Sequence, residues 1–298
     1  MKIRDLLFLI FIQFIWGINF VSLRFSVMDF SPILANAIRF ILVFAILVPF
    51  LKIIKGNMVT VFKIAIAMGV FHFGVVMMAI AYAGGVSEVA IVAQLNVPFS
   101  VILAVFMLKE VIHWKRTLGI IISFSGVVLL GFDPRVFSHL DAAFLVAVSA
   151  VALSFASIWM RQLHNVSVLT IQAWVALAAV VGSIPLSLMA ETDHLAQITS
   201  ASVYGWGAIL FSALFSSILG HGGMNYLFKK YEVSVISPYM LLMPLFGVGG
   251  SIFILDETLT WPMIVGGIVT MTGIVIITFR NQKRLSAKPV KPIVTGAV

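Results

Sequence analysis

One feature recurs ten times along this chain: a run of about 20 mostly apolar residues that ends near a proline, a glycine pair or a charged cluster. A helix needs about 20 such residues to cross a bilayer, because the hydrocarbon core is about 30 Å thick. The chain is 61% hydrophobic and 10% charged, whereas a soluble domain is roughly half apolar and a quarter charged. We therefore predict an all-α membrane protein. The ten transmembrane helices are expected at residues 6–27, 31–51, 60–83, 87–108, 115–132, 141–160, 167–189, 204–228, 234–255 and 262–279.

The basic residues gather in alternate loops between these runs. With a cytoplasmic N-terminus, 16 of the 19 lysines and arginines fall in cytoplasmic loops, Arg24 and Arg135 fall outside, and Arg39 lies within a span. This bias predicts that both termini are cytoplasmic. Although the net charge is +8, the basic residues form no stripe interleaved with aromatic residues, so we expect no nucleic-acid partner.

The two halves of the chain match each other at an offset of 147 residues. Each half contains five predicted spans, an odd number, so the halves are expected to lie in opposite orientations. Inverted repeats of this kind are typical of secondary transporters, whose substrate site lies near the bilayer midplane between the repeats. We expect one repeat at 1–134, a second at 135–281 and a cytoplasmic basic tail at 282–298. The matched pairs are Ser87 and Ser234, Glu110 and Glu257, Trp114 and Trp261, Gly119 and Gly266, and Gly126 and Gly273.

Several motifs resemble the EamA-type branch of the drug/metabolite transporter superfamily. In the first half these are Trp16-Gly17-Ile18-Asn19-Phe20 and Ala37-Ile38-Arg39-Phe40. In the second half, Leu241-Leu242-Met243-Pro244 and Asp256-Glu257-Thr258-Leu259-Thr260 are similar to the O-acetylserine and cysteine exporters of that branch. The resemblance implies a bacterial inner-membrane protein that exports amino acids or their derivatives by alternating access. Efflux of drugs or other metabolites is the alternative.

Arg39 is the sharpest candidate for a substrate contact. It lies about 12 Å below the outer end of the second predicted span, by helical rise. A charged side chain at that depth is costly, so it is expected to face a cavity or a partner. Its planar guanidinium can bind a substrate carboxylate bidentately. The alternative is that it reaches outward to Asp29 or Glu88.

Other polar and aromatic residues within the spans are candidates for the same site. Those of the first half are expected to line one polar cavity in that half with Arg39. An amide in a span also serves as a hydrogen bond between helices, so each has a structural alternative. The candidates are Trp16, Asn19, His72, Gln94, Asn96 and Tyr239.

Ion coupling and motion have their own candidates. Every carboxylate lies at or near a predicted loop, which leaves His72 and His221 as the groups within spans that titrate near neutral pH; the alternative is that they only bond neighbouring helices. Pro98 and Pro244 each remove a helical hydrogen bond within a span and are candidate hinges or static kinks. Gly247 and Gly249 are expected to let a neighbouring helix approach closely.

Rival classes have little support. The chain contains no cysteine and no His-Glu-x-x-His, Gly-x-Ser-x-Gly or P-loop pattern. We therefore expect no enzyme, cofactor or metal site. A receptor or an assembly subunit is the other alternative. The glycines of the fifth and tenth spans are compatible with a homodimer interface or with internal packing.

Overall fold

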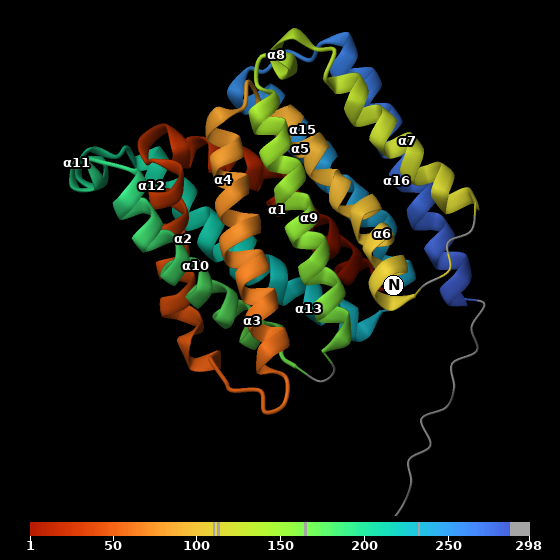
Figure 1. The fold of residues 1–298 in the computed structure, drawn as a ribbon, viewed down its shortest axis with the longest axis horizontal. Helices are drawn as coiled ribbons and strands as arrows, with labels where there is room; N and C mark the ends of the chain where they lie inside the picture. The colour runs from red at the N-terminus through yellow and green to blue at the C-terminus, as the bar shows by residue number, and fades with distance from the viewer. Residues whose placement is uncertain (110, 112–113, 164–165, 232, 287–298) are drawn as a thin grey trace, which may run out of the picture.

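The computed structural model describes residues 1–109, 111, 114–163, 166–231 and 233–286 (Figure 1). Within them the chain forms helices and turns without a strand. Eight helical segments are long and apolar enough to cross a membrane. Two more apolar segments, Tyr239–Leu255 and α7 (Trp114–Leu130, 17 residues), are shorter, so the count of ten spans stays a prediction. The eight are Ile3–Asp29, Pro32–Phe50, Met58–Tyr82, Val86–Leu108, Leu140–Gln162, Val168–Ala190, Val203–Phe228 and Trp261–Thr278.

Some of these segments are single helices. They are α1 (Ile3–Asp29), α9 (Leu140–Gln162), α10 (Val168–Ala190) and α16 (Trp261–Ser286). The segment α2 (Pro32–Leu47) ends in a 3₁₀ turn, η1 (Val48–Phe50). Because α16 continues to Ser286, the first residues of the expected tail are helical, and the rest of the tail lies outside the described residues.

Two segments contain a π-helical stretch. The first comprises α3 (Met58–Ile66), the π segment η2 (Ala67–His72) and α4 (Phe73–Tyr82). The second comprises α12 (Val203–Phe211), the π segment η4 (Ser212–Gly220) and α13 (His221–Lys230). Shifted by 147 residues, η2 falls within η4, so the interruptions match between the halves. A π segment widens the helix and is often found at functional sites.

Two other segments contain a 3₁₀ turn before a proline. The turn η3 (Ala93–Leu95) separates α5 (Val86–Val92) from α6 (Asn96–Leu108), and η5 (Ser237–Leu241) separates α14 (Val233–Ile236) from α15 (Leu242–Leu255). Pro98 and Pro244 are the third residues of α6 and α15. A proline lacks the N–H that would continue the α-helical ladder, which accounts for the irregular turn on its N-terminal side.

The loops divide into two faces. On the face that carries the N-terminus, Asp5 at the start of α1 accepts hydrogen bonds from Lys230 Nζ at 2.6 Å and from Tyr231 Oη at 2.6 Å. The bond with Asp5 raises the pKa of Lys230 above its usual value. On the same face, Trp174 Nε1 donates to the carbonyl of Lys52. We call this the N-terminal face.

The opposite, distal face is held by carboxylates and amides that bind helix starts. Figure 1 shows α11 (His194–Ser200) and α8 (Pro134–Phe137), two short helices that were not predicted, on this side. The bonds named below each join two segments that are expected on the same side of the membrane. The distal pairs are Asp29 with Ser202, Glu191 with Ile33 and Leu34, Gln197 with Ser31, Glu257 with Val86 and Ser87, and Asp133 with Thr260.

The helices α7 and α16 form a closely packed antiparallel pair. A Cβ at Gly119 would lie 2.9 Å from the carbonyl oxygen of Gly273, and one at Gly126 would lie 2.7 Å from that of Gly266. Gly119 thus meets Gly273, the repeat equivalent of Gly126, and Gly126 meets Gly266, the repeat equivalent of Gly119. A two-fold axis between the halves produces this relation. These glycines pack within one chain. Glu110, the repeat partner of Glu257, lies outside the described residues.

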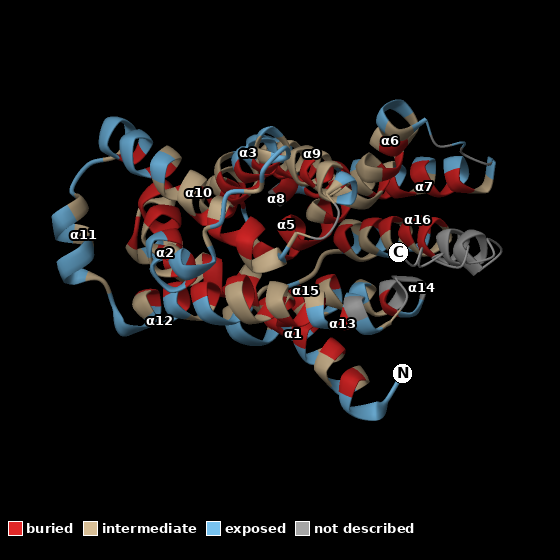
Figure 2. Cartoon of the chain, turned by 90° about the horizontal axis from the view of Figure 1, so that it is seen from below, coloured by how far each residue is buried: buried red, intermediate tan, exposed pale blue. Residues whose placement is uncertain are grey.

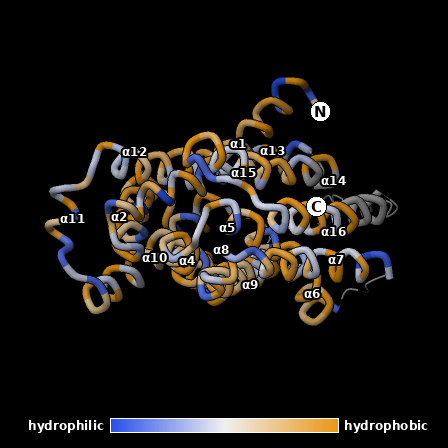
Figure 3. The backbone as a smooth tube through the Cα atoms, turned by 90° about the horizontal axis from the view of Figure 1, so that it is seen from above, coloured by the Kyte–Doolittle hydropathy of each residue, from blue (hydrophilic) through white to orange (hydrophobic). Residues whose placement is uncertain are grey.

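Apolar side chains lie on the outside as well as in the core. Figure 2 shows α1 along the lower edge of the view, with its N-terminal turns projecting beyond the other helices; it packs on α15, α12 and α4. Phe253, Met189 and Phe106 are more than 70% exposed, as expected for lipid-facing residues. Figure 3 shows hydrophilic stretches around α11 and near the N-terminus, with hydrophobic helices between them. The protein is therefore a multi-pass membrane protein.

Candidate functional site

A cavity of about 450 Å³ lies between the two halves of the chain. The first half lines it with α1, α2, η2–α4 and η3–α6, and the second half with α9, η4, α13, η5–α15 and α16. On α1 the lining residues run from Gln13 to Leu23, a distance of about 15 Å by helical rise. The cavity therefore lies between the two halves, as expected for inverted repeats, and not within the first half alone, because the second half supplies the opposite wall.

Arg39 is buried at the edge of this cavity, with 1% of its surface exposed. Its Nη2 donates a hydrogen bond of 2.9 Å to Ser217 Oγ, and the guanidinium carbon lies 5.0 Å from the ring centre of Phe73 and 5.1 Å from that of Phe40. Among the described residues it has no carboxylate partner. The guanidinium is thus held by a hydroxyl and two aromatic faces, which stabilise a cation without neutralising it. It does not reach Asp29 or Glu88.

The π segment η4 supplies the polar groups beside Arg39. Ser217 Oγ donates to the carbonyl of Ser212, five residues earlier, at 3.0 Å. Ser212 Oγ donates to Asn19 Oδ1 at 2.7 Å, and the indole Nε1 of Trp16 donates to the carbonyl of Ser216 at 3.1 Å. Because a π-helix shifts the backbone bonds by one residue, some carbonyl oxygens become available to side chains. The segment therefore connects Arg39 to the polar face of α1.

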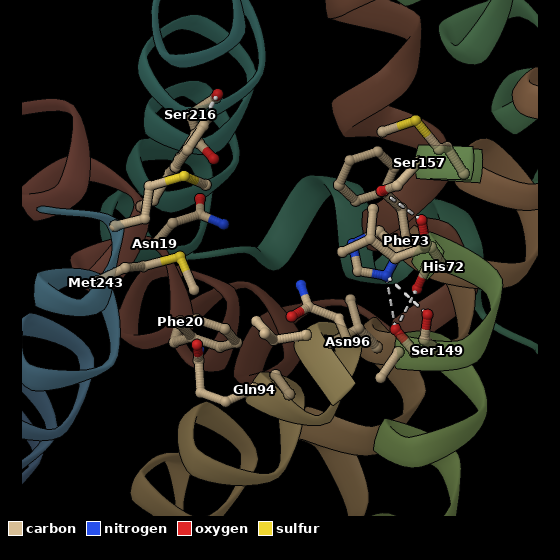
Figure 4. Close-up of a pocket in the computed structure, with 18 of the residues that line it drawn as sticks. Asn19, Phe20, His72, Phe73, Gln94, Asn96, Ser149, Ser157, Ser216 and Met243 are labelled. Atoms are coloured by element: carbon tan, nitrogen blue, oxygen red, sulfur yellow. Dashed lines mark hydrogen bonds between the residues drawn. The ribbon is translucent and has the colours of Figure 1, made fainter. Parts of the chain in front are cut away.

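His72 is the last residue of η2 and lies on the wall opposite Asn19 (Figure 4). Its Nδ1 lies 2.7 Å from Ser149 Oγ and 3.2 Å from the Ser149 carbonyl on α9. His221, the first residue of α13, packs its ring 5.4 Å from that of Trp16. Both imidazoles line the cavity, and His72 also bonds a neighbouring helix, as the alternative interpretation required.

The amides on the cavity wall have unused hydrogen-bonding capacity. Gln94 Nε2 donates to the Ala90 carbonyl, and Figure 4 shows the Asn96 side chain extending into the cavity. Asn96 Oδ1, Gln13 Oε1 and Arg39 Nε are buried without a partner within the protein. A buried polar atom without a hydrogen bond costs free energy, so these atoms favour a polar ligand or water beside them.

Most of the predicted site residues meet in this cavity, but Tyr239 does not. Trp16, Asn19, Arg39, His72, Gln94, Asn96 and His221 line it. The Tyr239 ring packs in an apolar cluster with Leu9, Met224 and Ile236, because the 3₁₀ turn η5 directs the next residues, Met240 and Leu241, to the cavity instead.

Other cavity residues were missed from the sequence. Ser149, Ser157 and Ser216 could not be identified from the sequence, because serines are common in transmembrane helices. Gln13 had a weak signal, since it is an amide within an apolar run.

The predicted close approach of helices holds for Gly247 and fails for Gly249. Near Gly247, a Cβ would meet Ala90 at 3.3 Å and the Gly17 carbonyl at 3.4 Å, whereas nothing lies within 4 Å of a Cβ at Gly249. Gly17 itself was missed: its Cβ would lie 2.5 Å from that of Phe246. The helices α1 and α15 therefore cross at Gly17 and Gly247, beside the cavity and near Pro244.

Comparison with known proteins gives one family. The model of the EamA-like transporter family matches the chain twice, over residues 4–132 and 141–279. A protein of Salmonella typhimurium named as a probable amino-acid metabolite efflux pump is 25% identical over 97% of this chain and 99% of its own length. An uncharacterized transporter of Archaeoglobus fulgidus is 30% identical over 88% of this chain and 94% of its own. A crystal structure superposes on 96% of this chain and all of its own, with a TM-score of 0.64 and 17% identity, which shows the fold alone.

Proposed function

This chain belongs to the EamA-like transporter family, and on that basis we propose that it exports amino acids or their derivatives by alternating access. The observation that carries the proposal is the cavity between the halves, with Arg39 and several amide side chains on its wall. A cargo carboxylate would accept hydrogen bonds from the guanidinium, whose Nε has no partner. The name of the Salmonella relative supports the same class of cargo.

The two halves would provide the alternating access. In this proposal they form inverted repeats at 1–134 and 135–281, and the antiparallel pairing of α7 with α16 supports their opposite orientation. Each half has an irregular span before Pro98 or Pro244. Bending at these turns would open one end of the cavity while the other end closes.

The proposal places both termini in the cytoplasm of a bacterium, with the protein in the inner membrane. Because the chain has no cysteine of its own, the orientation in the membrane can be measured with single introduced cysteines. A cysteine at Lys55, in the loop before α3, should react with a membrane-impermeant maleimide only in opened vesicles. One at Leu195, in α11, should react on intact cells. The reverse pattern would overturn the orientation.

Cargo class is tested by counterflow into proteoliposomes that contain the purified protein. The screen compares amino acids, their acetylated precursors and cationic drugs, with protein-free liposomes as the control. We expect exchange of the carboxylate compounds. No exchange of any compound would contradict the proposed function.

Efflux of apolar cationic drugs is the second candidate. The observation in its favour is the aromatic and thioether part of the wall, which includes Phe20, Phe73, Met68 and Met243, because such side chains adapt to varied apolar ligands. A drug pump should keep its counterflow when Arg39 is replaced by glutamine, whereas a carboxylate exporter should lose it.

A further inference from the structure

The charge of the cavity wall is one-sided. Arg39 is its permanent cation, and none of the described lining residues is a carboxylate. The other ionisable lining residues, His72 and His221, could only add positive charge. The described carboxylates lie toward the faces. Asp5 bonds Lys230 and Tyr231 at the N-terminal face, and Glu257 bonds the start of α5 at the distal face. Nothing on the wall therefore balances a second positive charge.

The unpaired atoms specify complementary groups in a ligand. Each of these atoms is buried, so it meets a ligand only once its side chain turns toward the cavity; Arg39 Nε then requires an acceptor, whereas Asn96 Oδ1 and Gln13 Oε1 require donors. A neutral N–H or O–H satisfies such amide oxygens. The remaining wall includes Phe20, Leu23 and Val76, which offers apolar surface to an uncharged substituent.

We propose that the cavity selects cargo by net charge, and prefers a carboxylate whose nitrogen is uncharged, such as an N-acylated amino acid, over the free amino acid. This inference rests on the proposed function. The carboxylate neutralises Arg39, and the amide N–H donates to Asn96. A free amino acid brings an ammonium group as well. At an effective dielectric constant of about 20, two like charges about 6 Å apart weaken binding by about a hundredfold, of which the attached carboxylate offsets a part.

The test is a matched series in counterflow with the wild-type protein. For alanine, serine and leucine, the free amino acid, its N-acetyl derivative and its amide carry net charges of 0, −1 and +1 near pH 7. We expect half-maximal counterflow at a concentration about tenfold lower for the N-acetyl compound than for the free amino acid, and no counterflow by the amide. Equal or better exchange of the free amino acids would overturn the inference.

Two variants assign the preference to named atoms. Arg39→Gln should remove the difference between the N-acetyl and free compounds. Asn96→Asp changes one atom and adds a negative charge to the wall, so it should shift the preference by about tenfold toward the free amino acid. The control is Asn225→Asp, on α13 outside the lining, which should keep the wild-type order. An unchanged order in folded Asn96→Asp protein would contradict the assignment of that residue.

The outcomes separate the two proposals. If no member of the series and no other carboxylate metabolite exchanges, the proposed function fails. If the free amino acids exchange best, the export function stands and charge selection fails. The wild-type series alone decides this, so the result does not depend on whether a variant folds.

Discussion

The guanidinium Nη2 of Arg39 lies 2.9 Å from the hydroxyl oxygen of Ser217, so a cation from the first half of the chain is held by the π segment of the second half. The same hydroxyl donates to the Ser212 carbonyl, which fixes its orientation. The bond to Ser217 leaves other N–H groups of the guanidinium, among them Nε, for a cargo carboxylate. Ser217 therefore holds Arg39 in place for cargo, and cargo binding and the contact between the halves share one guanidinium.

Replacing Arg39 should strongly weaken export of carboxylate cargo without preventing expression. Hydrogen bonds to a charged group contribute about 1.5–3 kcal/mol, so Arg39→Gln should raise the half-saturating concentration in counterflow by about tenfold to a hundredfold. Size-exclusion chromatography checks that the variant is folded. Wild-type flux from a folded variant would refute carboxylate binding by Arg39.

Replacing Ser217 should weaken binding without changing cargo charge preference, because Ser217 positions Arg39. Loss of one hydrogen bond of about 1 kcal/mol predicts a rise of about fivefold in KM for Ser217→Ala, with kcat little changed. Ser217→Thr keeps the hydroxyl and should restore most of the affinity. If the KM of Ser217→Thr rises as much as that of Ser217→Ala, the Ser217 hydroxyl does not position Arg39.

The seam between α7 and α16 should tolerate no added methyl group. A Cβ at Gly126 would meet the backbone nitrogen and the hydroxyl of Thr270, and overpacking of this kind costs about 1–3 kcal/mol. Gly126→Ala should therefore lower the thermal unfolding midpoint in detergent by several degrees. Gly249→Ala is the matched control, because nothing lies within 4 Å of its Cβ. Equal midpoints for the two variants would show that α7 and α16 have room for a methyl group at Gly126, contrary to the close approach described above.

The imidazoles of the cavity should govern the pH dependence of transport. His72→Gln and His221→Gln are each expected to flatten the dependence of counterflow rate on pH, since no described lining residue is a carboxylate. His139→Gln, outside the lining, should leave the profile unchanged. An unchanged profile in both cavity variants would remove histidine from ion coupling.

The sequence predicts the helices well because their lengths follow from the thickness of the bilayer. It does not predict where they become irregular: η2 and η4 carry no proline, and nothing else in their sequences marks them as π-helical. Arg39, Asn19 and Asn96 could be chosen in advance because a polar group within an apolar run is costly. Tyr239 could not be excluded and Ser149 could not be chosen, because the side of a helix that faces the cavity depends on the turn before it and on the packing of both halves.

The central claim is that the two halves enclose a water-filled cavity in which no carboxylate of the described wall neutralises Arg39. The reaction rates of introduced cysteines with charged reagents test this claim most directly. Ser157→Cys lies on the cavity wall, and Ile268→Cys lies on the outer surface of α16, 63% exposed, where lipid should cover it. Two methanethiosulfonate reagents of similar size are compared, one with a sulfonate and one with a trimethylammonium group. We predict that Ser157→Cys reacts faster with the sulfonate, that Arg39→Gln removes this difference, and that Ile268→Cys reacts with neither. A Ser157→Cys protein as unreactive as Ile268→Cys, or one that prefers the cationic reagent, would contradict the account.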